Sequence, residues 1–421
     1  MAFVEVLMHS CGQAGDKAER AMDARRTTVR DMRRSNRSVV LTKLFRDGPL
    51  SRHELAQTTA LSQASVSNLA GELLAEGVIE EAGAVESEGG RPRTLLRVAP
   101  GYRCVIGVDV GETRVQVELF DLSMTALAKA DYVLDTPRPD PDKVARYVLD
   151  GIDSVVRQSG ADPARVLGVG VGVSGVVEQP ADAVVDAQTL GWEAVPLGAM
   201  LRAGTDLPIV VDNGAKAQGQ AEMWFGAGRG VRHAVIALVG SGVGAAVIAD
   251  GVSYRGAFSS AGEWGHTTIA YGGRTCRCGA RGCLEAYVGA EAILDRYRLA
   301  NRGRPAPGND EESALAAIIA AADSSKTARR VLDDTIGYLG AGVATLVNLF
   351  NPERIVLGGW AGIALGTHYL DQIKHATAEH ALRRPYAHTE IQLCHLGQDA
   401  VALGAATLPL SRLLATGAAT H

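Results

Sequence analysis

The sequence predicts an α/β protein of two lobes, preceded by a small domain of three helices and a β-hairpin. The chain has 421 residues, enough for two or three domains with a well-buried core. After Pro100-Gly101, short apolar runs alternate with helical patterns, as is typical of two-lobed α/β proteins. Before that point, three short helical patterns are followed by two strand-like runs.

Composition excludes several classes of protein. The net charge of −5 gives no global basic excess, and no apolar run approaches the roughly 18 residues of a transmembrane helix. The first ten residues, "MAFVEVLMHS", lack the basic start and long apolar stretch of a signal peptide. Six cysteines are few for this length, and three are clustered, which favours a metal site over a disulfide framework. We therefore expect a cytoplasmic protein that does not associate with membranes.

The small domain is predicted over residues 35–99, after a tail (1–34) without apolar periodicity that we expect to be disordered. Its first helix is expected to place Val40, Leu41, Leu44 and Phe45 on one face and to end at Gly48-Pro49. The second begins with a capping box, Ser51 and Glu54, and the third follows Ser62. "VIEE" and "TLLRV" then form two strands, joined by a flexible "AGAVESEGGRPR".

Three short helices and a hairpin are typical of a winged helix-turn-helix, whose third helix lies in the DNA major groove. Here that helix begins "SQASVSN", and short polar side chains suited to base edges or phosphates face outward: Gln63, Ser65, Ser67 and Asn68. The helix lacks basic residues, so a domain used only for protein contacts is the alternative.

Positive charge is concentrated near this helix and in the loop after it. Residues 20–52 hold ten basic and three acidic side chains, which would supply the phosphate contacts. In "GGRPR", Arg91 and Arg93 are placed to enter a narrow minor groove. A plain linker is the alternative for that pentapeptide.

Residues 102–421 are predicted to form the two lobes, with three glycine turns at strand ends: "DVGET", "GSGVG" and "GGWAG". Such turns allow backbone N–H groups to approach phosphates, although any single one also suits a tight hairpin. The candidate nucleotide-binding residues in the first two turns are Asp109, Gly111, Thr113, Gly240, Gly242 and Gly244.

The order of these turns resembles the phosphate and adenosine segments of actin-like ATPases and sugar kinases. Residues 35–421 as a whole resemble the ROK family of repressors, open reading frames and kinases. The segment "EWGHTTIAYGGRTCRCGARGCLEAY" matches its signature, E-x-G-H followed by C-x-C-G-x-x-G-C-L-E. A winged helix before "GRPR" and a strand is how its repressor branch begins. The resemblance implies a two-lobed actin-like sugar kinase fold.

The signature loop (262–287) also implies a metal. Its imidazole and three thiolates form a closed four-ligand set suited to one structural Zn²⁺ per chain: His266, Cys276, Cys278 and Cys283. Gly279 and Gly282 permit the tight loop that this spacing needs. The alternatives are unligated buried thiols, or a catalytic zinc, for which no ligand position is left open to water.

By the same resemblance, Glu263, His266 and Glu285 contact sugar hydroxyls, and zinc braces the loop that carries them. Carboxylates accept two hydrogen bonds from vicinal hydroxyls, and His266 can face zinc with one ring nitrogen and sugar with the other. Solvated loop acids are the alternative for the two glutamates.

Catalysis is not expected. The family resemblance implies a segment E-N-D-A-N in ROK kinases, whose Asp is the general base that activates the sugar hydroxyl. This chain has "DNGAK" there, so Gly214 replaces the base. Asp212 could substitute only through a register slip, whereas Asn213 should still contact the sugar. In the first turn, Glu112 stands where a phosphate needs bare backbone, but "GSGVG" looks intact, so nucleotide binding stays open.

The sequence thus predicts a sugar-responsive transcriptional regulator, a repressor of carbohydrate genes with an inactive kinase-like domain. Its partners would be operator DNA, a sugar or sugar phosphate, and a second copy of the chain, because operators are usually two-fold symmetric. The rivals are a sugar kinase with an accessory DNA-binding domain and a regulator whose effector is a protein. Thr189 stands where the family usually has Asn, so the identity of the sugar is not predicted.

Overall fold

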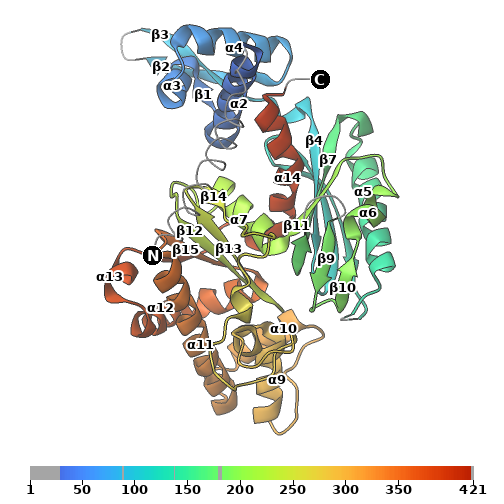
Figure 1. Ribbon diagram of the computed structural model, residues 1–421, viewed down its shortest axis with the longest axis vertical. Helices are drawn as coiled ribbons and strands as arrows, with labels where there is room; N and C mark the ends of the chain where they lie inside the picture. Colours follow the sequence, from blue (N-terminus) through green and yellow to red (C-terminus); the bar gives the residue numbers. More distant parts are fainter. Residues whose placement is uncertain (1–28, 88–89, 137, 179–182, 419–421) are drawn as a thin grey trace, which may run out of the picture. The chain divides into compact units, whose positions relative to one another are not determined.

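A computed structural model describes residues 29–87, 90–136, 138–178 and 183–418 (Figure 1). The described chain divides into two compact units. The smaller comprises residues up to Arg97 together with Leu413–His421, and the larger is Val98–Arg412. The sequence had placed all of 102–421 in the second domain, whereas the structure groups the last residues with the first.

The smaller unit has the three helices and the small sheet of a winged helix-turn-helix. The helices are α2 (Val29–Asp47), α3 (Arg52–Thr59) and α4 (Gln63–Ala75), and the sheet has the order β1-β3-β2. Its strands are β1 (Leu50–Ser51), β2 (Ile79–Ser87) and β3 (Gly90–Val98). Both halves of the predicted Ser51–Glu54 capping box are present, and Ser62 caps α4. The strands extend through most of the segment predicted to be a flexible loop.

Helix α2 begins at Val29, inside the predicted disordered tail of residues 1–34. Ion pairs, and not an apolar stripe, hold this first part of the helix. Arg33 lies 2.5 Å from Glu72, and Arg37 lies 2.6 Å from Glu76, both on α4. Apolar periodicity therefore could not reveal where the helix begins. Residues 1–28 lie outside the described part of the chain.

The last helix, α14 (Ala400–Thr416), begins in the larger unit, and its last residues are grouped with the smaller one. There, Leu414 and Ala418 are buried, and Arg37 Nε donates to the carbonyl of Gly417 at 2.9 Å. The Arg37 side chain is itself buried. Residues 413–418 are thus grouped with the smaller unit, and two of them are buried.

Ending the chain after Arg412 is expected to lower the free energy of unfolding of the smaller unit by about 3 kcal/mol. The truncation removes a buried leucine and a hydrogen bond to a charged group. Thermal unfolding and proteolysis within α2 measure the effect, with a chain ended after Ala418 as the control. Equal stability of the two truncated chains would contradict the assignment of Leu413–Ala418 to this unit's core.

Two five-stranded sheets form the lobes of the larger unit. The first has the order β11-β7-β4-β5-β6 and the second β14-β13-β12-β15-β16, each mixing parallel and antiparallel pairs. The strands of the first are β4 (Cys104–Val110), β5 (Arg114–Asp121), β6 (Ala126–Val133), β7 (Val166–Val173) and β11 (Ile209–Asn213). Those of the second are β12 (Ala234–Val239), β13 (Val243–Ala249), β14 (Val252–Ser253), β15 (Arg354–Gly358) and β16 (Glu390–Leu393). This is the predicted two-lobed α/β architecture.

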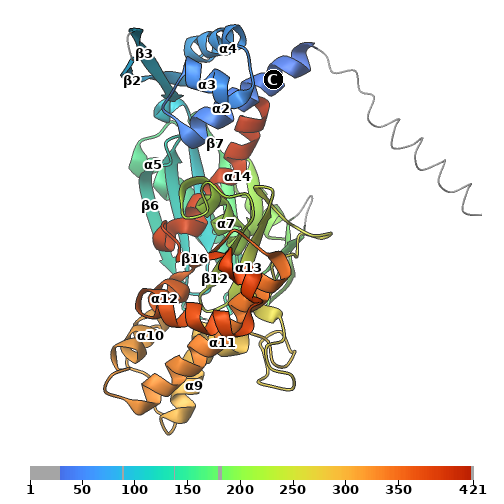
Figure 2. The same ribbon diagram turned by 90° about the vertical axis from the view of Figure 1, so that its left-hand side faces the viewer.

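Helices cover both sheets, and a three-stranded sheet lies beside the first. The longer helices are α5 (Pro141–Ser159), α7 (Gly214–Phe225), α9 (Ala290–Ala300), α10 (Glu311–Ala320), α11 (Lys326–Phe350) and α12 (Trp360–His380), and the shorter are α6 (Leu197–Arg202), α8 (Glu285–Val288) and α13 (Arg383–Ala387). The small sheet, β10-β9-β8, contains β8 (Val176–Glu178), β9 (Val184–Ala187) and β10 (Trp192–Val195). Figure 2 shows α11 and α12 packed side by side. None of the described helices has the length and hydropathy of a membrane span.

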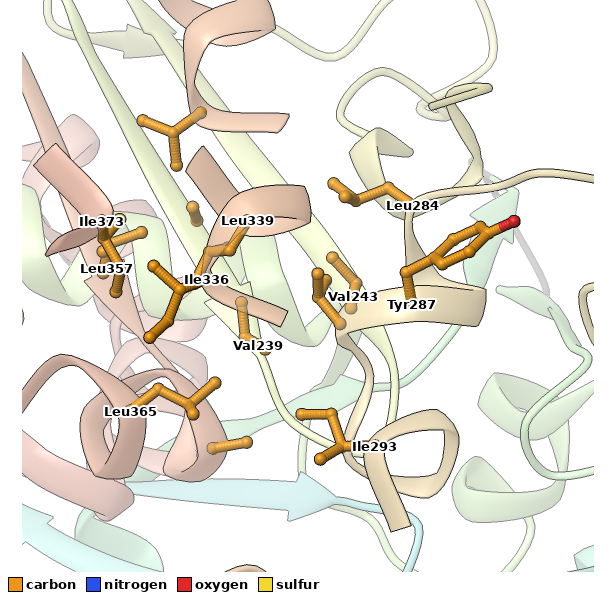
Figure 3. Close-up of a cluster of buried hydrophobic side chains, with 14 of the residues drawn as sticks. Val239, Val243, Leu284, Tyr287, Ile293, Ile336, Leu339, Leu357, Leu365 and Ile373 are labelled. Carbon is orange, nitrogen blue, oxygen red and sulfur yellow. The ribbon is translucent and has the colours of Figure 1, made fainter. Parts of the chain in front are cut away.

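The core of the second lobe connects its sheet to the cysteine loop. Val239 and Val243 of the sheet, Leu284 and Tyr287 after the last cysteine, and residues of α11 and α12 form one buried cluster (Figure 3). In the first lobe, α14 lies against the sheet where Gly107 and Gly170 leave room for its backbone. A Cβ at either position would lie within 2 Å of a carbonyl oxygen of α14. Gly107 on β4 and Gly170 in "VLGVGVGV" on β7 therefore allow close helix–sheet packing as well as strand formation.

Candidate functional site

One cavity of about 180 Å³ opens between the two lobes of the larger unit. It lies where the glycine turns after β4, β12 and β15 meet the start of α7 and the cysteine loop. Its lining includes every residue that the sequence assigned to nucleotide or sugar: Asp109, Gly111, Thr113, Asn213, Gly240, Gly242, Gly244, Glu263, His266 and Glu285. Segments up to 176 positions apart (Asp109 to Glu285) thus converge on one space, as the family resemblance implied.

The four predicted metal ligands form a compact cluster beside this cavity. One ligand atom from each of them lies within 4.8 Å of all the others: His266, Cys276, Cys278 and Cys283. His266 Nδ1 is 3.7 Å from Cys276 Sγ, and the sulfurs of Cys278 and Cys283 are 3.8 Å apart. Atoms at about 2.0–2.3 Å from a tetrahedral ion are about 3.3–3.8 Å apart, so these two separations fit one four-coordinate metal ion.

Local backbone structure builds this cluster. Isolated antiparallel β-bridges pair Thr268 with Cys283 and Thr275 with Arg281, so the loop folds back on itself. Gly279 and Gly282 adopt φ of +88° and +85°, and a Cβ at Gly282 would lie 1.8 Å from a carbonyl oxygen. The prediction that these two glycines permit the tight loop is confirmed.

The residues predicted to contact sugar differ in the hydrogen bonds that they already make within the protein. Glu285 accepts a hydrogen bond from Val243 N at 3.0 Å, and Asn213 both caps α7 and donates to the carbonyl of Gly175 at 2.7 Å. These bonds fix both side chains at the cavity wall. Glu263 is half-buried, and burial raises the pKa of its carboxyl. A partly desolvated carboxylate in a cavity is a strong acceptor for ligand hydroxyl groups.

Two further polar groups line the cavity. Among the described residues, Thr189 Oγ1 and Gln218 Nε2 are buried side-chain atoms without a hydrogen-bond partner. Such atoms are costly unless a ligand or water satisfies them. The sequence pointed to Thr189 as a departure from the family pattern, but it missed Gln218. The available signal was the spacing from Gly214, since residues four apart share a helix face.

Comparison with known proteins places these features in a family. The ROK family model matches residues 105–412, about three quarters of the chain. The chain belongs to the ROK family. It is 31% identical over 389 residues to a xylose repressor of Caldicellulosiruptor bescii, covering 91% of this chain and 97% of the repressor. It is 33% identical over 314 residues to a glucokinase of Halalkalibacterium halodurans, covering 72% of this chain and 93% of that enzyme.

A solved ROK family transcriptional regulator, described as a homologue of the E. coli MLC protein, superimposes with a TM-score of 0.75. The two chains are 26% identical, and the match covers 92% of this chain and 97% of the other. The match to the regulators therefore extends beyond the ROK domain, whereas the match to the glucokinase covers 314 residues, close to the length of that domain.

Within the ROK domain, Asp212 does not face the cavity. Its carboxylate makes a bidentate ion pair with Arg255, with N–O distances of 2.5 and 3.0 Å, and only 5% of the side chain is exposed. Lys216, in the first turn of α7, donates to the carbonyl of Ser259, and burial lowers the pKa of its amine. The β11–α7 junction is thus tied to the loop after β14, and Asp212 is held in a structural pair.

Asp109, near the end of β4, lines the ROK cavity. Burial raises the pKa of its carboxyl from 3.8 to about 7, and Arg114 opposes this only in part. Between about pH 4 and pH 7, the carboxyl is therefore protonated in the folded protein and ionised in the unfolded chain.

Replacing Asp109 with Asn should abolish a pH dependence of stability. In the wild-type protein, the raised pKa of Asp109 stabilises the folded state fully near and below pH 4. This stabilisation is lost as the pH rises towards 7, whereas an amide does not titrate. Urea unfolding at pH 5 and pH 8 measures this, and Asp109→Asn is expected to gain relative to wild type at pH 8. An unchanged difference between the two proteins at both pH values would contradict the raised pKa.

In the smaller unit, the predicted DNA-contacting side chains of α4 lie mainly on the surface. Gln63, Ser67 and Asn68 are exposed, and Gln63 Nε2 lies 2.9 Å from His53 Nδ1. Ser65 is half-buried and belongs to the helix cap, where it pairs with Ser62. Arg93 is exposed on β3, whereas the side chain of Arg91 lies outside the described part of the structure.

Proposed function

We propose that this ROK protein is a sugar-responsive DNA-binding regulator that represses genes of carbohydrate metabolism. The observation that carries the proposal is the presence of a winged helix-turn-helix unit and a cavity lined by hydroxyl-binding groups in one chain. The similarity to a xylose repressor over 91% of the chain supports it, since a match of that length extends beyond the ROK domain into the helix-turn-helix unit.

The cavity would hold the sugar through Glu263, His266, Glu285 and Asn213. Thr189 and Gln218, whose buried polar atoms have no protein partner in the described structure, are suited to receive two more polar groups of the ligand. D-xylose is the first sugar to test, because of the name of the relative that is 31% identical.

One structural zinc ion per chain would be held by His266, Cys276, Cys278 and Cys283. When bound, it supplies a rigid cross-link between residues that flank the sugar-binding glutamates. His266 Nδ1 faces the sulfurs, which leaves Nε2 for the cavity side of the ring. The ion would therefore fix the side chains that distinguish one sugar from another.

DNA would be contacted by Gln63, Ser65, Ser67 and Asn68 in the major groove and by Arg91 and Arg93 in the minor groove. A homodimer would present two such helices to the half-sites of an operator. Sugar can change DNA affinity only by binding two conformations of the protein with different affinity. The protein would act in the cytoplasm, where its operator lies.

The kinase-like domain would be inactive. Gly214, at the position of the catalytic Asp in ROK kinases, carries no group that could take a proton, and the ion pair with Arg255 keeps Asp212 from replacing it. The similarity to a glucokinase favours a sugar kinase as the second candidate function. The two are separated by an ATP-coupled assay, in which a regulator shows no sugar-dependent turnover and a kinase does.

Calorimetry with D-xylose, D-glucose, N-acetylglucosamine and their phosphates tests the sugar site directly. One of these should bind, and Glu263→Gln should weaken it by at least about tenfold, because hydrogen bonds to a charged acceptor are lost. Glu193→Gln, an exposed glutamate on β10, is the control and should change nothing. Sugar binding that is equally tight in Glu263→Gln would contradict the assigned site.

A further inference from the structure

An ion pair joins the two lobes at the glycine turns of the cavity. Glu112 lies in the first glycine turn, between β4 and β5, and Arg277 lies between Cys276 and Cys278 in the second lobe. Arg277 Nη1 lies 2.9 Å from Glu112 Oε2. Only 13% of the Glu112 side chain and 26% of the Arg277 side chain are exposed, so the pair is largely shielded from solvent.

The Glu112 carboxylate lies against bare backbone of the second glycine turn. A Cβ at Gly242 would be only 3.0 Å from Glu112 Oε1, and Arg277 Nη2 donates to the carbonyl of Ser241 at 3.0 Å. A glycine turn beside a guanidinium group is an arrangement that binds phosphate oxygens. Here the protein's own carboxylate fills it.

Carboxylates outnumber the positive charge around Arg277. Besides Glu112, Arg277 faces Glu285 at 3.5 Å and Glu291 at 3.4 Å, so one cation serves three carboxylates. Burial also raises the pKa of Glu112 to about 7, an effect that Arg277 opposes. A nucleotide phosphate would add negative charge where it is already in excess.

We propose that Glu112 is a built-in anion that occupies the phosphate position of the cavity and excludes nucleoside phosphates from it. Glu112 is then a specificity-determining residue, which restricts the cavity to ligands that do not bring phosphate to the glycine turns. This inference concerns ligand choice in the larger unit and does not depend on DNA binding or on the sugar response.

Binding of a fluorescent ATP analogue with Mg²⁺, and of inorganic pyrophosphate in competition with it, tests the proposal on the full-length, metal-loaded protein. Glu112→Ala should bind both at least about tenfold more tightly than wild type, since the competing charge is removed and Arg277 is released. The double variant Glu112→Ala with Arg277→Ala should lose that gain. Asp295→Ala removes an ion pair of 2.7 Å with Arg274 on the same loop and serves as the matched control, without a gain.

Thermal unfolding and zinc content establish that each variant is folded. If Glu112→Ala does not fold, Glu112→Gln preserves the shape and removes the charge, and a smaller gain is expected from it. Two results would overturn the proposal. One is a wild-type protein that binds the analogue as tightly as the variant, and the other is a folded Glu112 variant that gains no nucleotide binding.

Discussion

Replacing Cys276 with Ser is expected to prevent binding of the proposed zinc ion, lower the free energy of unfolding by more than about 3 kcal/mol and abolish sugar binding. Structural zinc contributes about 10–16 kcal/mol in small zinc peptides, so the loss of one of four ligands has a large effect. Cys276 is 5% exposed, and its sulfur lies 3.6 Å from a carboxylate oxygen of Glu285, at the cavity wall. The loss of metal should therefore reach the sugar site directly.

Elemental analysis, urea unfolding and sugar calorimetry measure the three effects. Cys104→Ser is the control, because Cys104 is also a buried thiol but lies on β4, far from the cluster along the chain and outside it. That variant should keep one zinc ion and its affinity for sugar. A Cys276→Ser protein that retains one equivalent of zinc with unchanged stability would refute the assigned ligand set.

Replacing Arg255 with Ala should destabilise the larger unit by about 2–3 kcal/mol. The Asp212 carboxylate, 5% exposed, would lose both hydrogen bonds from Arg255 and keep the one from Asn213 N at 2.9 Å, which leaves a buried charge without its ion-pair partner. Adding Asp212→Asn to Arg255→Ala should recover part of the loss, since no buried charge is then left. Chemical unfolding of the single and double variants provides the measurement.

Arg232→Ala is the matched control for this prediction. Arg232 pairs with Asp250 at 2.7 Å on the same lobe, but both side chains are about 70% exposed, so we expect a loss below about 1 kcal/mol. Equal losses of unfolding free energy in Arg255→Ala and Arg232→Ala would show that burial of Asp212 does not increase the contribution of its ion pair to stability.

Local sequence patterns predicted most of the elements and the members of the site. Helix α11 (Lys326–Phe350) is one of the helical patterns that follow Pro100-Gly101, because an amphipathic stripe runs through it and Ser325 caps it. The short ligand spacing in the cysteine loop likewise predicted a cluster that the structure brings together. In each case the information lies within a few neighbouring residues.

Pairings between distant segments were not predictable in the same way. The Glu112–Arg277 pair joins residues 165 positions apart, and the Arg37–Gly417 hydrogen bond joins residues 380 apart. The sequence showed that Glu112 is unusual in a phosphate-binding turn, but it did not show that Arg277 is its partner. Nothing in the local pattern at Leu413–Ala418 indicates that these residues are grouped with the helix-turn-helix unit.

Fluorescence anisotropy of the full-length protein on its own upstream DNA, at fixed salt and with each sugar of the panel, tests the central claim most directly. The account predicts specific binding that one sugar changes by at least about tenfold, a free-energy coupling of about 1.4 kcal/mol. The same sugar should have no effect on Glu263→Gln bound to the same DNA. No specific DNA binding, or specific binding that no sugar alters, would contradict the account.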